Sequence, residues 1–377
     1  MKTDEINNYE RNNDKAKVSM GLAITYLVHL SIASPSGGRS EIENLNVIKK
    51  IREGYLDYPY ASAQAMKRSL RDTLKGLGYT ISPIINSAPA RTVGDPLKYI
   101  DDDLFGYMNA GSKKTGNSDI DKLNGIRKSV VSMTPLLSLS EFEDNIDFGS
   151  NMIGLRAGGN PMPYETEIHR GWYRISVYVE LDRIGSGDGF IKGKKEVVKN
   201  IDVKNLPEVT EKYDFVEIKD GKCNLLKYEY DKLDKEIKYN RAKALVDAIR
   251  FLAPSGRNSN WLIDLTPKLM VAAYVKGAKT PFLEVNLLDQ SQKDKDVINL
   301  KAIKEAEETF SDGIEDIVVG YRKDLIEEPV EQDNNIKPVS MKEAFSKIDG
   351  WLKLHFEPED QKQNPSNRNE NIDSVQE

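Results

Sequence analysis

The stretch VSMGLAITYLVHLSI, residues 18–32, decides the fold of this chain. Its odd positions are mostly small or polar, such as Gly21, Thr25 and His29. Its even positions are all large and apolar: Val18, Met20, Leu22, Ile24, Tyr26, Val28, Leu30 and Ile32. This period of two predicts a long β-strand with one buried face. The glycine-rich segment 34–39 ends the strand as a loop.

Periodic apolar residues on the C-terminal side of this strand predict five more elements. A helix follows Pro59, with apolar residues at spacings of three and four, and Gly76 and Gly78 end it. The others are strands at 129–139, 173–181 and 261–275 and a helix at 239–253. The order βαββαβ predicts an α+β fold of the ferredoxin-like (RRM-like) type. Beyond residue 300 we expect one helix rich in Glu and Lys.

The charge of the chain is distributed unevenly. The net charge is −6. Residues 1–300 carry 44 Lys and Arg against 41 Asp and Glu, whereas residues 301–377 carry 10 against 19. The body is therefore mildly basic, and a protein that grips few phosphates needs only a local basic stripe.

Several classes of protein and site are not expected. No apolar run is long enough to cross a membrane, and the polar N-terminus is unlike a secretory signal, so we expect a cytoplasmic protein. The single cysteine, Cys223, has no Cys or His neighbour for a zinc site. The three histidines are far apart, and the run Gly185–Gly189 is most simply a loop. We therefore expect no cofactor and no metal.

Basic and small polar residues gather at the start of the first helix. Ser62 and Gln64 lie in its first turn, where backbone N–H groups and the helix dipole favour an anion. Lys67 and Arg71 are four residues apart, hence on one face. This predicts a phosphate cradle that ignores base identity; the alternative is a capped helix with a solvated basic face. Arg68 is a further candidate.

Two loops could reach the same phosphates. Arg39 lies in the loop after the first strand, and Arg257 and Asn258 lie between the second helix and the fourth strand. Taken alone, each loop is more simply an ordinary turn.

The acidic run Asp101-Asp102-Asp103 invites a different hypothesis. Carboxylate clusters can hold Mg²⁺ for phosphoryl transfer. Three consecutive residues cannot easily face one metal, so acids in the first turn of a helix are the favoured interpretation.

Six segments, in order along residues 18–290, give the sequence a specific resemblance. They are the opening strand, Ser62–Arg68, Asp101–Tyr107, Ser132–Leu136, the block from Phe148–Asn151 to Glu167–His169, and the loop Pro254–Asn260. Together they resemble the DevR family of CRISPR-associated autoregulators, which supply the backbone subunit of type I Cascade complexes.

This resemblance implies a hand-like architecture. The palm would comprise residues 18–82, 129–139, 171–183 and 239–290, with a finger insertion at 83–128 and a β-hairpin thumb at 140–170. The remaining segments would be a polar tail (1–17), a peripheral insertion (184–238), a C-terminal helical extension (291–356) and a disordered acidic tail (357–377).

The resemblance also implies a function and its partners. The protein would bind guide crRNA, oligomerise along it with copies of itself and other Cascade subunits, and present it to target DNA, with no membrane partner. In the thumb, Met152 and Met162 could wedge against a displaced base, and Arg156 and Arg170 could contact phosphates. Subtype I-B is favoured, and no enzymatic activity is expected, since the loop 34–40 lacks the acid of cutting relatives.

Two other functions stay open at the level of sequence. A metal-dependent endoribonuclease would use Asp101–Asp103. A DNA-binding transcriptional regulator would need a helix that reads a groove, and no helix-turn-helix pattern is present.

Overall fold

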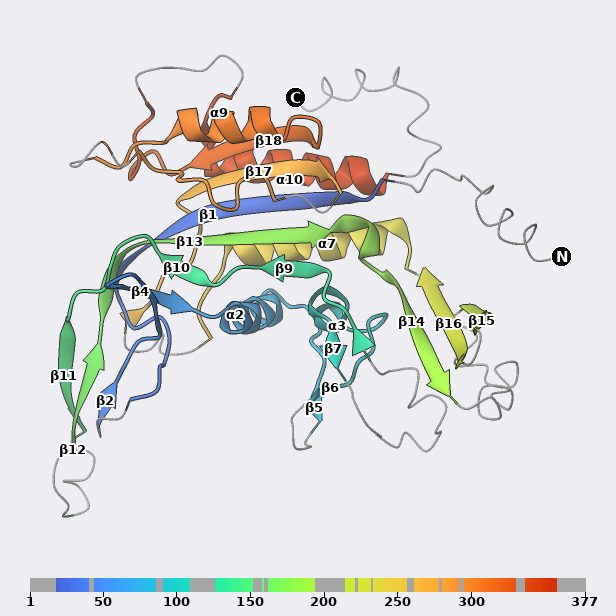
Figure 1. Ribbon diagram of the computed structural model, residues 1–377, viewed down its shortest axis with the longest axis horizontal. Coiled ribbons are helices and arrows are strands. Elements are labelled where there is room, and N and C mark those ends of the chain that lie inside the picture. Colours follow the sequence, from blue (N-terminus) through green and yellow to red (C-terminus); the bar gives the residue numbers. More distant parts are fainter. Residues whose placement is uncertain are drawn as a thin grey trace, which may run out of the picture.

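The chain folds around one large sheet that carries smaller sheets at its two ends (Figure 1). The fold is mixed α+β, as predicted. The computed structural model describes residues 18–40, 44–85, 91–108, 126–151, 158, 162–193, 214–220, 223–231, 233–255, 261–277, 280–289, 291, 295–329 and 336–357. Among these, no helix has both the length and the apolar character that a membrane crossing requires.

The large sheet has nine strands in the order β19-β18-β17-β1-β13-β10-β4-β3, with β9 also paired to β13. The strand β1 is central and pairs antiparallel with both β13 and β17. The strands are β1 (Met20–Ala33), β3 (Lys50–Glu53), β4 (Leu56–Ala61), β9 (Val131–Met133), β10 (Leu136–Ser138), β13 (His169–Glu180), β17 (Leu269–Lys276), β18 (Ile314–Tyr321) and β19 (Val339–Ser340).

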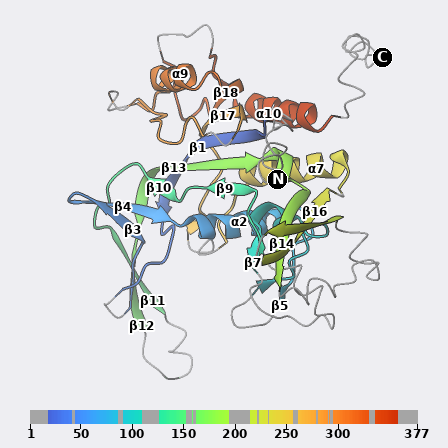
Figure 2. The same cartoon turned by 45° about the vertical axis from the view of Figure 1, so that its right-hand side comes forward.

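The smaller sheets project from the large one. In Figures 1 and 2, the β11–β12 hairpin and the β14–β16 sheet lie at opposite ends of it. The three-stranded sheets are β11 (Ile146–Asn151), β12 (Met162–Glu167) and β2 (Leu45–Asn46), and β14 (Ser186–Gly193), β16 (Cys223–Asp231) and β15 (Asp214–Asp220). The two-stranded pairs are β5 (Ile84–Ile85) with β6 (Arg91–Thr92), and β7 (Tyr107–Met108) with β8 (Ile126–Arg127).

The helices cover both faces of the large sheet. They are α2 (Ala63–Gly76), α3 (Ile100–Phe105), α7 (Lys235–Arg250), α9 (Leu300–Thr309) and α10 (Met341–Phe356), with a short 3₁₀ turn, η2 (Leu181–Arg183). Apolar residues of α2, α3, α7 and α10 form one core, and those of α9 belong to a second core. The two predicted palm helices correspond to α2 and α7.

The prediction that residues 18–32 bury only one face is wrong. Leu22, Ile24 and Tyr26 enter the first core, but Ala23 and Leu27 on the other face enter the second. The small odd residues leave room for a covering aromatic ring: a Cβ at Gly21 would collide with the ring of Tyr178. The small face of β1 is therefore packed rather than solvated.

Two predicted strands are shorter than their patterns. The strand expected at 129–139 divides into β9 and β10, because Pro135 has no N–H to donate and Thr134 turns its hydroxyl to the Ser176 N–H, at 2.9 Å. The strand expected from Trp261 begins only at Leu269.

Three segments outside the predicted palm contain more regular structure than the sequence predicts. In segment 83–128, α3 is wholly buried; its six residues are too few for a visible period. The segment 291–356 holds two helices rather than one, and β18 and β19 extend the large sheet. Helix α10 packs closely on β18, since a Cβ at Gly320 would collide with that of Ala344.

In the third of these segments, 184–238, the run Gly185–Gly189 differs from the predicted loop. Ser186 instead begins β14, and β14, β16 and β15 form an antiparallel sheet. Glycine is rare in strands, which hid this one in the sequence.

Candidate nucleic-acid interface

The loop after β1 is held beside the start of α2. The Ser36 hydroxyl donates to the Tyr60 carbonyl at 2.6 Å, and the Gly38 N–H donates to the Val47 carbonyl at 2.7 Å. Tyr60 is two residues before Ser62, the N-cap of α2. Two predicted RNA-contacting regions, the Arg39 loop and the start of α2, are thus neighbours in space.

The start of α2 is a capped helix with an exposed outer face. The Ser62 hydroxyl accepts a hydrogen bond from the Ala65 N–H at 3.3 Å, so it serves the helix itself. Arg39, Gln64 and Arg68 are exposed. Arg68 pairs with Asp72 at 3.1 Å, an exposed pair. We call Arg39, Gln64 and Arg68 the α2 strip.

Lys67 and Arg71 share a helical face, as their spacing predicts, and both have partners inside the protein. The Lys67 ammonium donates to the Ser129 hydroxyl at 3.0 Å. The Arg71 guanidinium lies 3.5 Å from the Asp101 carboxylate and 4.8 Å from the centre of the Phe105 ring. Burial lowers the pKa of both groups, and for Lys67 the neighbouring charge of Arg71 adds to this effect. This face is directed toward α3 and toward Ser129, which follows β8.

A groove opens beside the C-terminal half of α2, with a volume of about 670 Å³. Its lining includes Arg68, Arg71, Lys75 and Arg91, together with Asp101. We call it the α2 groove. Lys75 and Arg91 were missed by the sequence interpretation. Lys75 is four residues after Arg71, so the helical spacing could have revealed it, but Arg91 reaches the groove only through the β5–β6 hairpin.

Only some of the predicted thumb residues lie within the part of the chain that the structure describes. Ile146–Asn151 and Met162–Glu167 pair as the antiparallel hairpin β11–β12, and β2 pairs parallel with β12 as a third strand. Met152 and Arg156 lie outside the described residues, and only the strand position of Met162 is described. Arg170 is exposed at the start of β13 and lines a second pocket of about 650 Å³ with His29 and His169.

The base of this hairpin is fixed by buried polar groups. Glu167 accepts from the Lys50 ammonium at 2.7 Å and from the Ile48 N–H at 2.8 Å. The His169 ring bonds the Tyr173 hydroxyl at 2.8 Å and the Glu141 carbonyl at 3.1 Å. Burial lowers the pKa of His169. Glu167 and His169 therefore bind two different sets of neighbouring residues, and both sets belong to the protein's own structure.

The late loop also contacts α2. The Ser255 N–H donates to the Ser69 hydroxyl of α2 at 3.2 Å. Arg257 and Asn258, the candidates in this loop, lie outside the described residues.

The three aspartates of α3 diverge to three different sets of partners. Asp101 accepts from the Ser82 N–H at 2.8 Å, and Asp102 accepts from the N–H groups of Gly94 and Asp95, both at 2.9 Å. Burial raises the pKa of Asp101. Their side chains are directed to different segments, and the residue before the helix, Tyr99, makes no side-chain cap. Across the described ranges, no His, Cys, Asp and Glu side chains cluster as three or more potential metal ligands.

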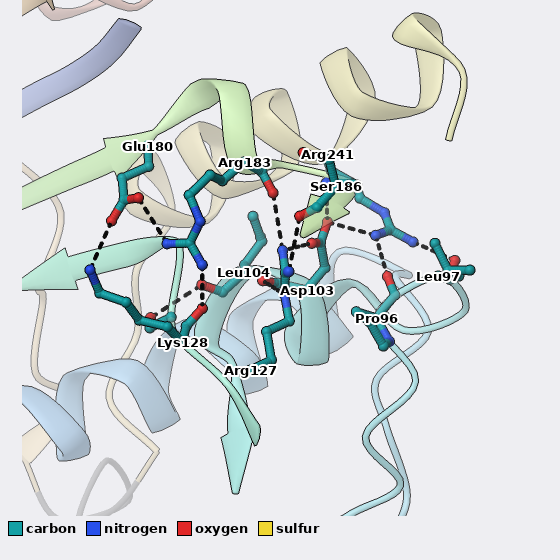
Figure 3. Close-up of polar contacts among 12 residues, drawn as sticks. Pro96, Leu97, Asp103, Leu104, Arg127, Lys128, Glu180, Arg183, Ser186 and Arg241 are labelled. Atoms are coloured by element: carbon teal, nitrogen blue, oxygen red, sulfur yellow. Dashed lines mark hydrogen bonds and ion pairs between the residues drawn. The ribbon is translucent and has the colours of Figure 1, made fainter. Parts of the chain in front are cut away.

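Asp103 lies at the centre of a buried ionic network (Figure 3). Its carboxylate accepts from Arg127 and from Arg241, the latter at 2.6 Å, and from the Gly185 N–H at 2.9 Å. Arg127 also donates to the carbonyls of Ser186 and Arg183, both at 3.0 Å.

The same network reaches a third segment through Arg241. This guanidinium of α7 donates to the Pro96 carbonyl at 2.6 Å and the Leu97 carbonyl at 2.7 Å. Asp103 thereby joins α3, α7, β8 and the start of β14. Sequence analysis missed Arg127 and Arg241, because their link to Asp103 spans 24 and 138 residues.

Comparison with known proteins gives one family. The sequence model of the family described as "CRISPR-associated negative auto-regulator DevR/Csa2" matches residues 64–320. A curated relative, "CRISPR-associated protein Cas7/Cst2/DevR" of Myxococcus xanthus (strain DK1622), is 33% identical over 85 residues, which are 21% of this chain and 27% of the relative. The match thus spans about a quarter of the length of that relative.

Two solved structures are similar to most of the chain. One is a chain of a "CRISPR RNA-guided surveillance complex" with 15% identity and a TM-score of 0.47, and the other is a chain of such a complex in a "pre-nicking" state with 12% identity and a TM-score of 0.49. Both cover 88% of this chain and 99% of the other. Because the family match includes well over half of the sequence, the chain belongs to the DevR/Csa2 family of CRISPR-associated proteins.

Proposed function

We propose that this protein is a backbone subunit of a type I Cascade complex, of subtype I-B, that binds guide crRNA in the cytoplasm without cutting it. The observation that carries the proposal is the α2 strip, where Arg39, Gln64 and Arg68 stand exposed on two neighbouring segments of a DevR/Csa2 family member. Cationic and amide side chains contact phosphates without reading bases, which is what a holder of varied guides requires.

The strand order supports an RRM-like palm. The predicted palm strands correspond to β1, β9 with β10, β13 and β17, and they lie side by side as β17-β1-β13 with β9 and β10 both paired to β13. The helices α2 and α7, which connect them, pack in the same core. This is the arrangement expected of a ferredoxin-like βαββαβ unit.

The β11–β12 hairpin is our candidate for the thumb. Phe148 is 68% exposed and Ile146 51% exposed on one face of β11, so this hairpin offers apolar surface to a partner. In the proposed complex the partners are the crRNA, target DNA through the guide, further copies of this chain and other Cascade subunits.

The absence of nuclease activity is also a proposal. It is supported by the aspartates of α3, each of which is buried and accepts hydrogen bonds from a different segment. Such carboxylates would have to abandon their partners to converge on Mg²⁺.

The test is a salt titration of binding to single-stranded RNA. We expect the wild-type protein to bind without cleavage, in Mg²⁺ and in EDTA alike. Arg39→Ala/Arg68→Ala should weaken binding and reduce the slope of log affinity against log salt by about 0.7 for every phosphate that the variant no longer neutralises. Lys301→Ala, which removes an exposed lysine of α9, is the matched control.

Three outcomes would contradict the proposal. RNA cleavage that requires Mg²⁺ and is abolished in Asp102→Ala would favour the endoribonuclease hypothesis. Tighter binding to one duplex DNA sequence than to single-stranded RNA would favour a transcriptional regulator. An unchanged salt slope in the double variant would remove the α2 strip from the interface.

A further inference from the structure

Exposed apolar side chains of the β11–β12 hairpin lie among carboxylates. Ile146 and Phe148 alternate onto one face of β11, and the exposed Glu165 lies directly opposite Phe148 on β12. Glu143 and Asp144, just before the hairpin, are also exposed. We call these five residues the acidic patch. Because carboxylates repel phosphates, the patch fits a basic protein surface and not RNA.

The α2 groove offers a surface of the opposite charge. Its lining carries four cations against two carboxylates, and Lys75 is exposed there. The lining also has an apolar part, to which Ile84 contributes a side chain that is 56% exposed. The other members of this part are Tyr79, Ile81 and Pro83. A groove of about 670 Å³ with such a lining can accept an aromatic ring and place cations beside its carboxylate neighbours.

The positions of the two surfaces decide which kind of contact they can make. The β11–β12 and β5–β6 hairpins project from the same side of the large sheet, with α2 between them (Figures 1 and 2). The acidic patch would repel its own kind in a symmetric dimer, since each copy presents the same charge. A contact between unlike surfaces instead leaves one surface of each kind unused at the two ends, so further copies can join in an open row.

We propose that the acidic patch of one copy docks on the α2 groove of the next, with Phe148 in the groove and the carboxylates near Lys75 and Arg91. The inference rests on the proposed RNA binding and names the surfaces through which neighbouring copies touch. Arg68 belongs to both the α2 strip and the groove lining, so the guide and the neighbouring copy meet there. The contact is small, and assembly depends on RNA to hold the copies at a high effective concentration.

The experiment compares binding to a short and a long single-stranded RNA by fluorescence anisotropy. An RNA of about 10 nucleotides holds one copy, and one of about 60 nucleotides holds several. We expect the wild-type protein to bind the long RNA cooperatively, with a Hill coefficient above that for the short RNA. Phe148→Ala should lower the affinity for the long RNA about tenfold, as loss of a central aromatic contact does, and leave the short RNA unaffected. Tyr55→Ala, which removes a fully exposed aromatic side chain outside the patch, is the matched control and should change neither.

An exchange of charges tests the pairing of the two surfaces. Lys75→Glu should abolish cooperativity, because it places a carboxylate opposite the acidic patch of the neighbour. The double variant Glu165→Lys/Lys75→Glu should restore it, since every contact again joins opposite charges. The readout is the ratio of the affinities for the long and the short RNA, because each charge change also alters the attraction to phosphates.

The outcomes separate this inference from the proposed function. Non-cooperative binding of the long RNA by the wild-type protein, or unchanged cooperativity in Phe148→Ala, would overturn the docking and leave RNA binding intact. An equal loss of affinity for both RNAs in folded Phe148→Ala would assign the patch to RNA. Failure of the wild-type protein to bind either RNA would overturn both proposals.

Discussion

Helices α2 and α3 each carry a cluster of like charges, and the two clusters are used in opposite ways. On α3, all three aspartates are completely buried, and each accepts from a different segment of the chain. On α2, Arg68 and Lys75 are exposed, whereas Lys67 and Arg71 turn inward to Ser129 and Asp101. In sequence, the acidic cluster was the candidate for chemistry and the basic one for binding.

The difference shows that the role of a charge cluster depends on whether its groups are buried and which groups they pair with. A buried carboxylate is costly unless it is paired, and the guanidinium and N–H groups around α3 meet that requirement. An exposed guanidinium in a weak surface pair can exchange its partner for a phosphate. The acidic cluster therefore stabilises the fold, while the basic cluster is divided between fold and surface. Four variants test this contrast, and we give them from the largest expected effect on stability to the smallest.

The largest effect is expected for Asp103→Ala. This variant leaves Arg127 and Arg241 as buried cations without their carboxylate, so the free energy of unfolding should fall by about 3–5 kcal/mol. Urea denaturation would measure it. Asp72→Ala, which removes an exposed carboxylate of α2, is the control and should cost less than about 1 kcal/mol. If the free energy of unfolding fell by similar amounts in the two variants, the proposed contrast between α2 and α3 would be wrong.

A smaller effect is expected for Gly106→Ala at the end of α3. Gly106 has a φ of 66°, and a Cβ there would collide with the Arg127 carbonyl. We expect a decrease of about 1–3 kcal/mol in the free energy of unfolding. Gly54→Ala is the matched control, because Gly54 has a φ of 61° but no atom within 4 Å of the added Cβ. If Gly54→Ala costs as much, backbone strain alone explains the decrease.

The third variant, Asp101→Asn, tests the α3 carboxylate that lies nearest to the α2 cations. Burial raises the pKa of Asp101 in the folded protein, so the folded state holds this proton more tightly than the unfolded state. Stability due to Asp101 is therefore fully present below the ordinary carboxyl pKa and falls as pH rises through the raised one. The free energy of unfolding of Asp101→Asn relative to wild type should increase over this acidic window. A difference that falls with pH would show that Arg71 dominates over burial.

The smallest effect on stability is expected for Arg68→Ala. Its exposed pair with Asp72 contributes little, so the free energy of unfolding should change by less than about 0.5 kcal/mol. RNA affinity should nevertheless fall, and both quantities can be measured on one preparation. A marked decrease in stability with unchanged affinity would assign Arg68 to the fold.

The sequence by itself determined the main elements and the family. The alternation in residues 18–32 and the spacing of Met66, Leu70 and Leu74 depend on local geometry, because side chains repeat every two residues in a strand and every 3.6 in a helix. The corresponding elements are β1 and α2. The segments that resemble the DevR family were likewise visible in the sequence, and the family match begins at residue 64.

Only the tertiary structure decided which charges are internal. Asp103 meets Arg241 across 138 residues, and Arg71 meets Asp101 through a turn of the chain that no period predicts. The second core over the small face of β1 was equally hidden, because its cover comes from β13 and from residues beyond 280. Local patterns report the preferences of single segments. Burial and ion pairing arise where segments distant in the sequence meet, and this is why the inward direction of Lys67 and Arg71 and the α2 groove required the folded chain.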